Sequence, residues 1–219
     1  MAPEELFLRR AIVTGSALVY WVGVWLQARR VRRRIGRSPN LKPRGAKERL
    51  LWAGWVLVVA AWLGQPFLAG GADSSFALRL AWVLLHPAGF AAGFGLVLAG
   101  YAGTLWCYAA MGDAWRIGVN RKEKTALVAA GPYRFVRHPI YLFQIVMLAG
   151  VLLLLPTALS LFMLALHFGC VRVKAADEES YLLAMHNEAY RNYLRCTGRL
   201  IPKLGRPSSR IAPPLDRAR

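Results

Sequence analysis

Five apolar segments, separated by strongly charged ones, constrain the fold of this chain more than any other feature. They comprise residues 11–28, 51–69, 87–111, 140–155 and 157–171. A helix needs roughly 20 apolar residues to cross the hydrocarbon of a bilayer, which is about 30 Å thick. The last two segments are shorter, and Pro156 separates them, so we expect a helical hairpin whose tip need not reach the far surface. The sequence predicts an all-α fold, a polytopic helical membrane protein with about five transmembrane segments.

Basic residues indicate how these segments are oriented. All but three of the 29 Lys and Arg residues lie in segments 29–49, 116–137 and 172–219. Loops rich in Lys and Arg remain in the cytoplasm, so these three segments are predicted to be cytoplasmic. The N-terminus and residues 65–79 are then outside, and both ends of the hairpin are inside. One topology satisfies every segment.

The net charge of +18 bears on the partners of the chain. Nucleic acid would suit such a charge, but here the basic residues flank apolar spans. Anionic headgroups are the more economical partner, so we predict contact with membrane lipids and none with nucleic acid. Cys107, Cys170 and Cys196 show neither a CxxC spacing nor a metal-ligand pattern, which predicts no disulfide and no metal site.

A basic and aromatic cluster precedes the hairpin, in residues 131–141. Pro139 suits the first turn of a helix, and Arg134 and Arg137 then lie beside its free N–H groups, which favours an anion. His138 lies at the same point and can exchange a proton near neutral pH. Three aromatic side chains, Tyr133, Phe135 and Tyr141, offer flat faces to a planar or cationic group.

An acidic cluster, Asp177, Glu178 and Glu179, follows the hairpin. The hairpin returns it to the face that bears Arg137 and His138. Two interpretations are open at this point: a salt-bridge cluster, or a site for a ligand that carries both a carboxylate and a cationic amine or sulfonium. A zwitterion with a purine and a ribose would use all three kinds of group. A tyrosine-bearing amphipathic helix that follows is expected to cover the site.

Together these motifs resemble the isoprenylcysteine carboxyl methyltransferase family and its bacterial relatives. The motifs are a Gly-x-Tyr turn (131–133), Arg-His-Pro-x-Tyr (137–141), an apolar hairpin, the acidic pair, Tyr-x-x-Tyr (190–193) and Ile-Pro (201–202). Order and spacing agree over residues 115–204. The resemblance implies an integral membrane methyltransferase that uses S-adenosylmethionine. Combined with the distribution of Lys and Arg, it predicts a protein of the bacterial inner membrane, with its N-terminus outside and its cofactor pocket and catalytic face cytoplasmic.

The resemblance also implies the site residues. Cofactor contacts are expected at Thr125, Ala126, Leu127, Val128, Tyr133, Arg137, His138, Pro139, Ile140, Tyr141 and Glu178. His138, Tyr141 and Glu179 are the candidate catalytic residues, because a thiol or amine acceptor would need a base, whereas a carboxylate would not. Lys174 and Arg172 are expected to face the acceptor, a lipophilic small molecule or lipid. The family's eukaryotic members have arginine where Lys174 stands and histidine where Thr125 stands, and Asn187 replaces a usual glycine.

Three regions follow from this interpretation: N-terminal transmembrane helices over 1–111 with an Arg-rich loop at 29–49, a methyltransferase region over 112–204, and a polar basic tail over 205–219. Two alternatives are open. One is an NADPH-dependent membrane reductase of the sterol-reductase class, since a phosphate also suits an arginine cluster. The other is a non-catalytic lipid-binding protein in which the motifs only anchor the hairpin.

Overall fold

The structure, a computed structural model, describes residues 3–36, 38–39, 43, 45–70, 73–116 and 127–203. Its five long helices are α1 (Pro3–Ile35), α2 (Ala46–Leu68), α3 (Pro87–Met111), α4 (Pro139–Leu154) and α5 (Ala158–Cys196). Three short 3-10 turns, η1 (Trp82–Leu84), η2 (Gly112–Ala114) and η3 (Gly131–Arg134), lie between them. The predicted all-α class is confirmed. The expected tail over 205–219 lies outside the described residues.

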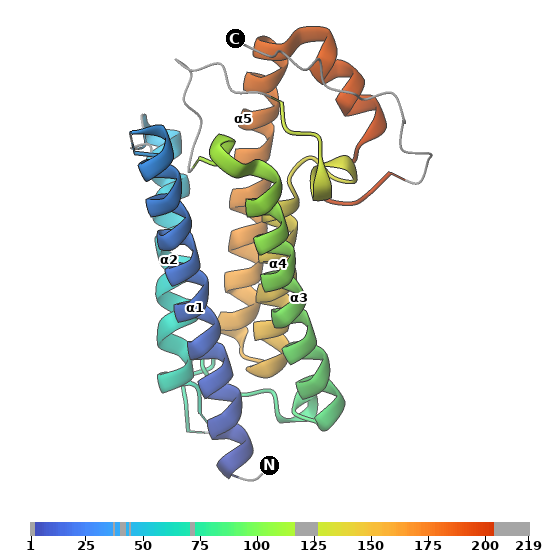
Figure 1. The fold of residues 1–219 in the computed structure, drawn as a ribbon. Coiled ribbons are helices and arrows are strands. Elements are labelled where there is room, and N and C mark those ends of the chain that lie inside the picture. The colour runs from blue at the N-terminus through green and yellow to red at the C-terminus, as the bar shows by residue number, and fades with distance from the viewer. Residues whose placement is uncertain are drawn as a thin grey trace.

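The helices form a bundle whose long axes run in nearly the same direction (Figure 1). The helix α1 lies beside α2, α5 packs on α2 and α4, and α3 packs along α4. Among the described residues, four helices are long and apolar enough to cross a membrane, and α4 is a shorter apolar helix. This confirms a polytopic helical membrane protein. The loop before α4 packs on the end of α3 and lies beside α5, at the end of the bundle opposite the start of α1 (Figure 1).

The helix α1 extends beyond the predicted span at both ends. It has 33 residues, and its last turns contain arginines that we expected in the loop at 29–49. Arginine is a good helix former, and cations at a helix C-terminus interact favourably with the helix dipole. The helix ends at Gly36, whose φ of 70° is accessible to glycine and whose N–H bonds the carbonyl of Arg32 at 3.0 Å.

A buried arginine compensates for the short length of α4. With 16 residues, α4 is about 24 Å long, less than the hydrocarbon thickness. Carbonyls at a helix end within a membrane need a partner, since no water is available there. Arg9, fully buried, donates to the carbonyls of Leu153 at 3.3 Å and Leu154 at 3.2 Å, and it pairs with Glu5 at 2.9 Å. Arg9 therefore supplies hydrogen-bond donors to the carbonyls at the C-terminal end of α4.

Glycines allow α3 and α4 to approach closely. A Cβ on Gly93 would lie 2.9 Å from the carbonyl oxygen of Gly150, and a Cβ on Gly100 would lie 2.8 Å from that of Phe143. A Cβ on Gly103 would meet the ring of Phe143 itself. These glycines therefore serve helix packing, which fixes the position of α4 and of the residues at its N-terminus.

The helix α5 is longer than the predicted segment 157–171. It has 39 residues, begins after Thr157, whose Oγ1 accepts from the N–H of Ser160 at 3.0 Å, and continues through Asp177, Glu178 and Glu179. The acidic residues thus lie on a rigid helix, not in a loop. At Asn187 the backbone breaks, and the last helical turns bend back beside the loop before α4 (Figure 1).

The break at Asn187 gives a testable prediction. Asn187 has φ 45° and ψ −116°, a conformation that disfavours any residue with a Cβ. We expect Asn187→Gly to raise the free energy of unfolding by about 1 kcal/mol. The matched control is Asn192→Gly, at an exposed helical position four residues before the helix ends, which should lower it by about 0.5–1 kcal/mol. Thermal unfolding in detergent measures both, and equal effects of the two changes would show that the break stores no strain.

Candidate functional site

Two turns before α4 position the basic residues. Gly131 begins η3 with φ 57°, a conformation that favours glycine, and Pro132 follows in the first turn. His138 is the residue before α4, and Pro139 occupies its first turn, where a missing N–H costs nothing. These turns place Tyr133 and His138, both buried, just before the N-terminus of α4, where η3 packs on α3.

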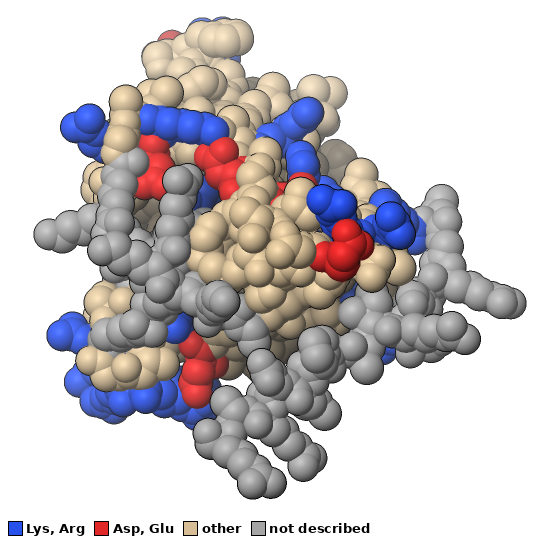
Figure 2. Space-filling model, turned by 90° about the horizontal axis from the view of Figure 1, so that it is seen from above, with Lys and Arg blue, Asp and Glu red and all other residues tan. Residues whose placement is uncertain are grey.

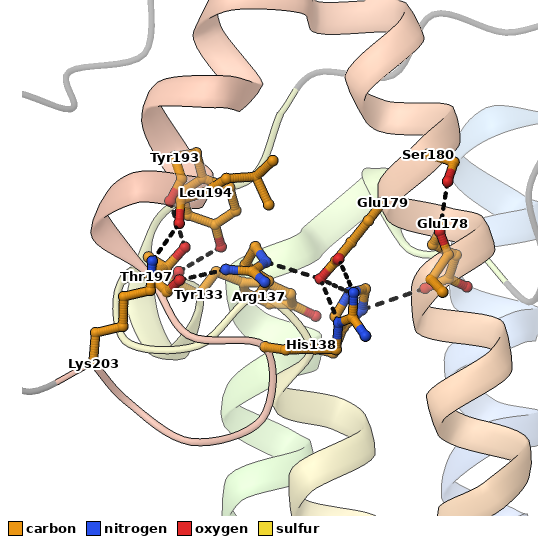
Figure 3. A network of polar contacts seen from close by, with 12 residues as sticks. Tyr133, Arg137, His138, Glu178, Glu179, Ser180, Tyr193, Leu194, Thr197 and Lys203 are labelled. Atoms are coloured by element: carbon orange, nitrogen blue, oxygen red, sulfur yellow. Dashed lines mark hydrogen bonds and ion pairs between the residues drawn. The ribbon is translucent and has the colours of Figure 1, made fainter.

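The C-terminal strap, defined here as Thr197–Arg199, holds this loop in place. The N–H groups of Arg137 and His138 donate to the carbonyls of Gly198 at 2.8 Å and Arg199 at 3.1 Å. The Arg137 guanidinium also donates to the carbonyl of Thr197. From the last helical turns, the Tyr193 hydroxyl donates to the carbonyl of Tyr133 at 2.6 Å. The terminal segment is therefore attached to the loop mainly through backbone groups (Figure 3).

Glu179 is the centre of a charge cluster, by which we mean Arg137, His138, Glu178, Glu179 and Arg199. Its Oε1 accepts from Arg137 Nε at 2.9 Å and Arg199 Nε at 3.0 Å, and contacts His138 Nε2 at 3.3 Å. Its Oε2 accepts from Arg199 Nη2 at 2.5 Å. Burial disfavours the ionised carboxylate, but the hydrogen bonds from His138, Arg199 and Arg137 outweigh burial and hold the pKa of Glu179 well below its usual range.

Glu178 has different partners. Its Oε1 accepts from the Tyr141 hydroxyl at 2.9 Å, and its Oε2 lies 3.4 Å from His138 Nδ1. Among the described residues, no arginine or lysine pairs with it. Its side chain is 21% exposed, against 11% for Glu179. Glu178 is therefore the carboxylate of the cluster with capacity for a further cation.

The environment of His138 favours its charged form. Its two ring nitrogens face Glu178 and Glu179, so both contacts are hydrogen bonds only when both nitrogens carry a proton. Burial opposes the charge, but the bonds to Glu178 and Glu179 outweigh burial and raise the pKa of His138 above its usual value. The ring also stacks on Tyr141, with centroids 5.7 Å apart. In its protonated form His138 donates from both ring nitrogens, and the catalytic roles of His138, Tyr141 and Glu179 stay predictions.

The charge cluster predicts a pH dependence of stability. Because its pKa is raised, His138 contributes stability that is fully present below about pH 6.5 and is lost as the pH rises through the higher folded value. Because its pKa is lowered, Glu179 contributes stability that is present above about pH 4.5 and is lost at lower pH. We expect the difference in unfolding midpoint between the wild type and Glu179→Gln to be largest between about pH 4.5 and 6.5. A difference independent of pH would contradict this.

The structure brings together most of the predicted cofactor residues. Tyr133, Arg137, His138, Pro139, Ile140, Tyr141 and Glu178 gather around the N-terminus of α4. Leu127 and Val128 lie half-buried in the preceding loop, whereas Thr125 and Ala126 lie outside the described residues. The Arg137 guanidinium donates hydrogen bonds to the Glu179 carboxylate and the Thr197 carbonyl. Arg134 instead is exposed, above the ring of Phe135. Cofactor contact by these residues stays a prediction.

The two residues that were expected to face the methyl acceptor, Lys174 and Arg172, lie in different environments. Lys174 is 8% exposed and lies one helical turn before Glu178 on α5. It makes no hydrogen bond or ion pair with a described residue. Arg172 is exposed, with its guanidinium 5.9 Å from the ring of Phe168. Of the two, Lys174 is the buried cation on the helix that carries the acidic residues.

Sequence reasoning missed Arg199 and the strap. Arg199 stands two residues before the Ile-Pro motif, in a stretch that the sequence marks only as the end of the region. The remaining acidic residue, Asp177, pairs with Lys47 of α2 at 2.6 Å. The acidic residues thus have separate roles, although both earlier interpretations of the cluster treated them together. In the described part of the chain, no group of three or more His, Cys, Asp or Glu residues is placed to hold a metal ion.

Basic side chains surround this end of the molecule, with acidic ones among them (Figure 2). Membrane-length helices with a charged site at one end define a polytopic membrane protein. Within that class, residues 93–184 match the sequence model of the isoprenylcysteine carboxyl methyltransferase (ICMT) family. The predicted resemblance to this family is confirmed over this region. The family supports a membrane methyltransferase in general.

A nickel-cobalt-cadmium resistance protein, NccN, from Alcaligenes xylosoxydans xylosoxydans is also similar to this chain. The two are 28% identical over 102 residues, which are 47% of this chain and 44% of NccN. The chain therefore spans less than half the length of this relative.

Proposed function

We propose that this protein transfers a methyl group from S-adenosylmethionine to a lipophilic acceptor delivered by the membrane. The observation that carries the proposal is the contrast between the two glutamates. Glu179 is bound by two arginines and His138, whereas among the described residues Glu178 contacts Tyr141 and His138 alone. A half-buried carboxylate beside aromatic rings suits a ligand with a cationic amine and a planar base.

The residues present fit this cofactor. Glu178 would hold its ammonium group, and Tyr133, His138 and Tyr141, with Ile140 and Pro139, would form the wall around it. Leu127 and Val128, in the loop before η3, are the further described residues expected to contact the cofactor, whereas Thr125 and Ala126 lie outside the described residues. When bound, the cofactor would supply a methyl group for in-line displacement, with the bond from the acceptor to carbon forming as the carbon–sulfur bond breaks. The protein's part is to orient the reactants and to exclude water.

The charge states of the site favour an acceptor that is already ionised. Both ring nitrogens of His138 are engaged, and three cations hold Glu179, so neither is a good base. The Tyr141 hydroxyl donates a hydrogen bond to Glu178. A carboxylate acceptor needs no deprotonation, unlike an amine or a thiol. Lys174, buried and without a described anionic partner, is the residue that would face such a carboxylate, with Arg172 nearer the headgroups.

Membrane lipids are the other partner in this proposal. An apolar groove of about 300 Å³ lies between α1 and α2, and Trp25 lines it. The Arg29 guanidinium lies 5.3 Å from the Trp25 ring, where an anionic headgroup would meet it. We place the protein in the bacterial inner membrane, with the N-terminus outside and the site on the cytoplasmic face, because 26 of its 29 basic residues flank that face in the topology above.

Calorimetric titration of the detergent-purified protein with S-adenosylhomocysteine tests the proposal, with NADPH as the matched control. We expect saturable binding of S-adenosylhomocysteine and none of NADPH. Binding of NADPH instead would favour the alternative, a membrane reductase that uses the arginines for a phosphate. If folded protein binds neither compound, the methyltransferase proposal is wrong and a lipid-binding role takes its place.

A further inference from the structure

The side chain of Arg199 has a role that the fold does not require. The strap is already attached by the N–H groups of Arg137 and His138, by the Arg137 guanidinium and by the Tyr193 hydroxyl. None of these contacts uses the Arg199 guanidinium. That group instead lies along Glu179, with Nε donating to one carboxylate oxygen and Nη2 to the other.

Arg199 supplies half of the neutralisation of Glu179. Of the four contacts that described residues make to this carboxylate, two come from Arg199, and Arg199 Nη2 donates to Oε2. A two-point contact of this kind is both stronger and more directional than a contact with a single donor. Without it, Glu179 would keep Arg137 and His138 but would present one unneutralised oxygen beside Glu178.

An unneutralised Glu179 would compete with Glu178 in two ways. It would draw His138, which bridges both carboxylates, away from Glu178. It would also attract the same cationic group of a ligand, from the wrong side of the His138 ring. The groups that face Glu179 are Arg137 and His138 from the loop, Arg199 from the strap, Tyr190 from the last helical turns and Glu178 on its own helix.

We infer that Arg199 is a positioning residue: it keeps Glu179 neutralised, so that Glu178 is the carboxylate of the charge cluster that binds the cationic group of the cofactor. This inference rests on the proposed function. It gives the strap a part in selecting where the cofactor binds, although Arg199 lies 20 residues beyond Glu179 in the sequence.

The test compares S-adenosylhomocysteine affinity in four variants. Arg199→Gln should weaken binding about tenfold, and Arg199→Lys, which keeps the charge without the two-point contact, should recover part of that loss. Arg195→Gln, at an exposed position in the same terminal segment, should bind as the wild type does. The decisive variant is Arg199→Gln combined with Glu179→Gln. Removing the competing charge should bring the affinity back to within about threefold of the wild type.

The outcomes separate the inference from the proposed function. If the wild type does not bind S-adenosylhomocysteine, the proposed function fails. If the wild type binds and Arg199→Gln binds equally well, the inference is wrong. It is equally wrong if the double variant is weaker than Arg199→Gln alone, because a purely structural arginine would give that result. Recovery in the double variant supports the competition between the two carboxylates.

Discussion

Glu178→Gln is expected to weaken the binding of S-adenosylhomocysteine by at least about 30-fold, measured by calorimetry in detergent. The amide keeps the size of the side chain and one oxygen that can accept from Tyr141. It removes the negative charge that would pair with the ammonium group of the ligand. Loss of one partner of a buried, hydrogen-bonded charge pair costs about 2 kcal/mol or more, which corresponds to this factor.

Asp177→Asn is the matched control for this change. Asp177 precedes Glu178 on α5, but it pairs with Lys47 of α2, and its side chain is 36% exposed. Exposed ion pairs contribute little, so the affinity should stay within about twofold of the wild type. If Glu178→Gln and Asp177→Asn bind with the same affinity as the wild type, a different group holds the cofactor.

The sequence predicts the parts of this structure that depend on composition and periodicity. The apolar helices and the helix start at Pro139 both follow from residue types along the chain. The extent of α1 and α5 does not, because charged residues extend a helix beyond the bilayer as readily as they form a loop. The contacts of Arg9 could not be predicted either, because its partners are carbonyls near residue 154 and no local sequence pattern indicates such a long-range contact.

The site shows the same division. Motif order places His138 and the two glutamates at one end of the bundle, but it does not say which glutamate is neutralised. That distinction depends on Arg199, whose position requires the break at Asn187 and the return of the chain over the loop. Adjacent residues on a helix point about 100° apart, so Glu178 and Glu179 meet different partners. Only the three-dimensional arrangement separates them.

Gly150→Leu is expected to have the largest effect on stability. A Cβ at Gly150 would lie 2.6 Å from the carbonyl oxygen of Gly93 and 2.9 Å from the amide nitrogen of Val97, so any side chain forces α3 and α4 apart. Backbone atoms cannot yield as a flexible side chain does, and we expect a loss of about 3 kcal/mol. For a chain of this size the unfolding midpoint should fall by about 6–12 °C. Size-exclusion chromatography after heating in detergent measures this midpoint.

Gly95→Leu separates helix contact from the general effect of replacing glycine. Gly95 lies on the same helix two residues after Gly93, yet a Cβ there would meet nothing within 4 Å. Leucine at this lipid-facing position should leave the midpoint within about 2 °C of the wild type. Because α4 carries His138 and Tyr141 at its N-terminus, Gly150→Leu should also weaken cofactor binding, whereas Gly95→Leu should not. Equal midpoints for the two variants would mean that the α3–α4 contact does not position the site.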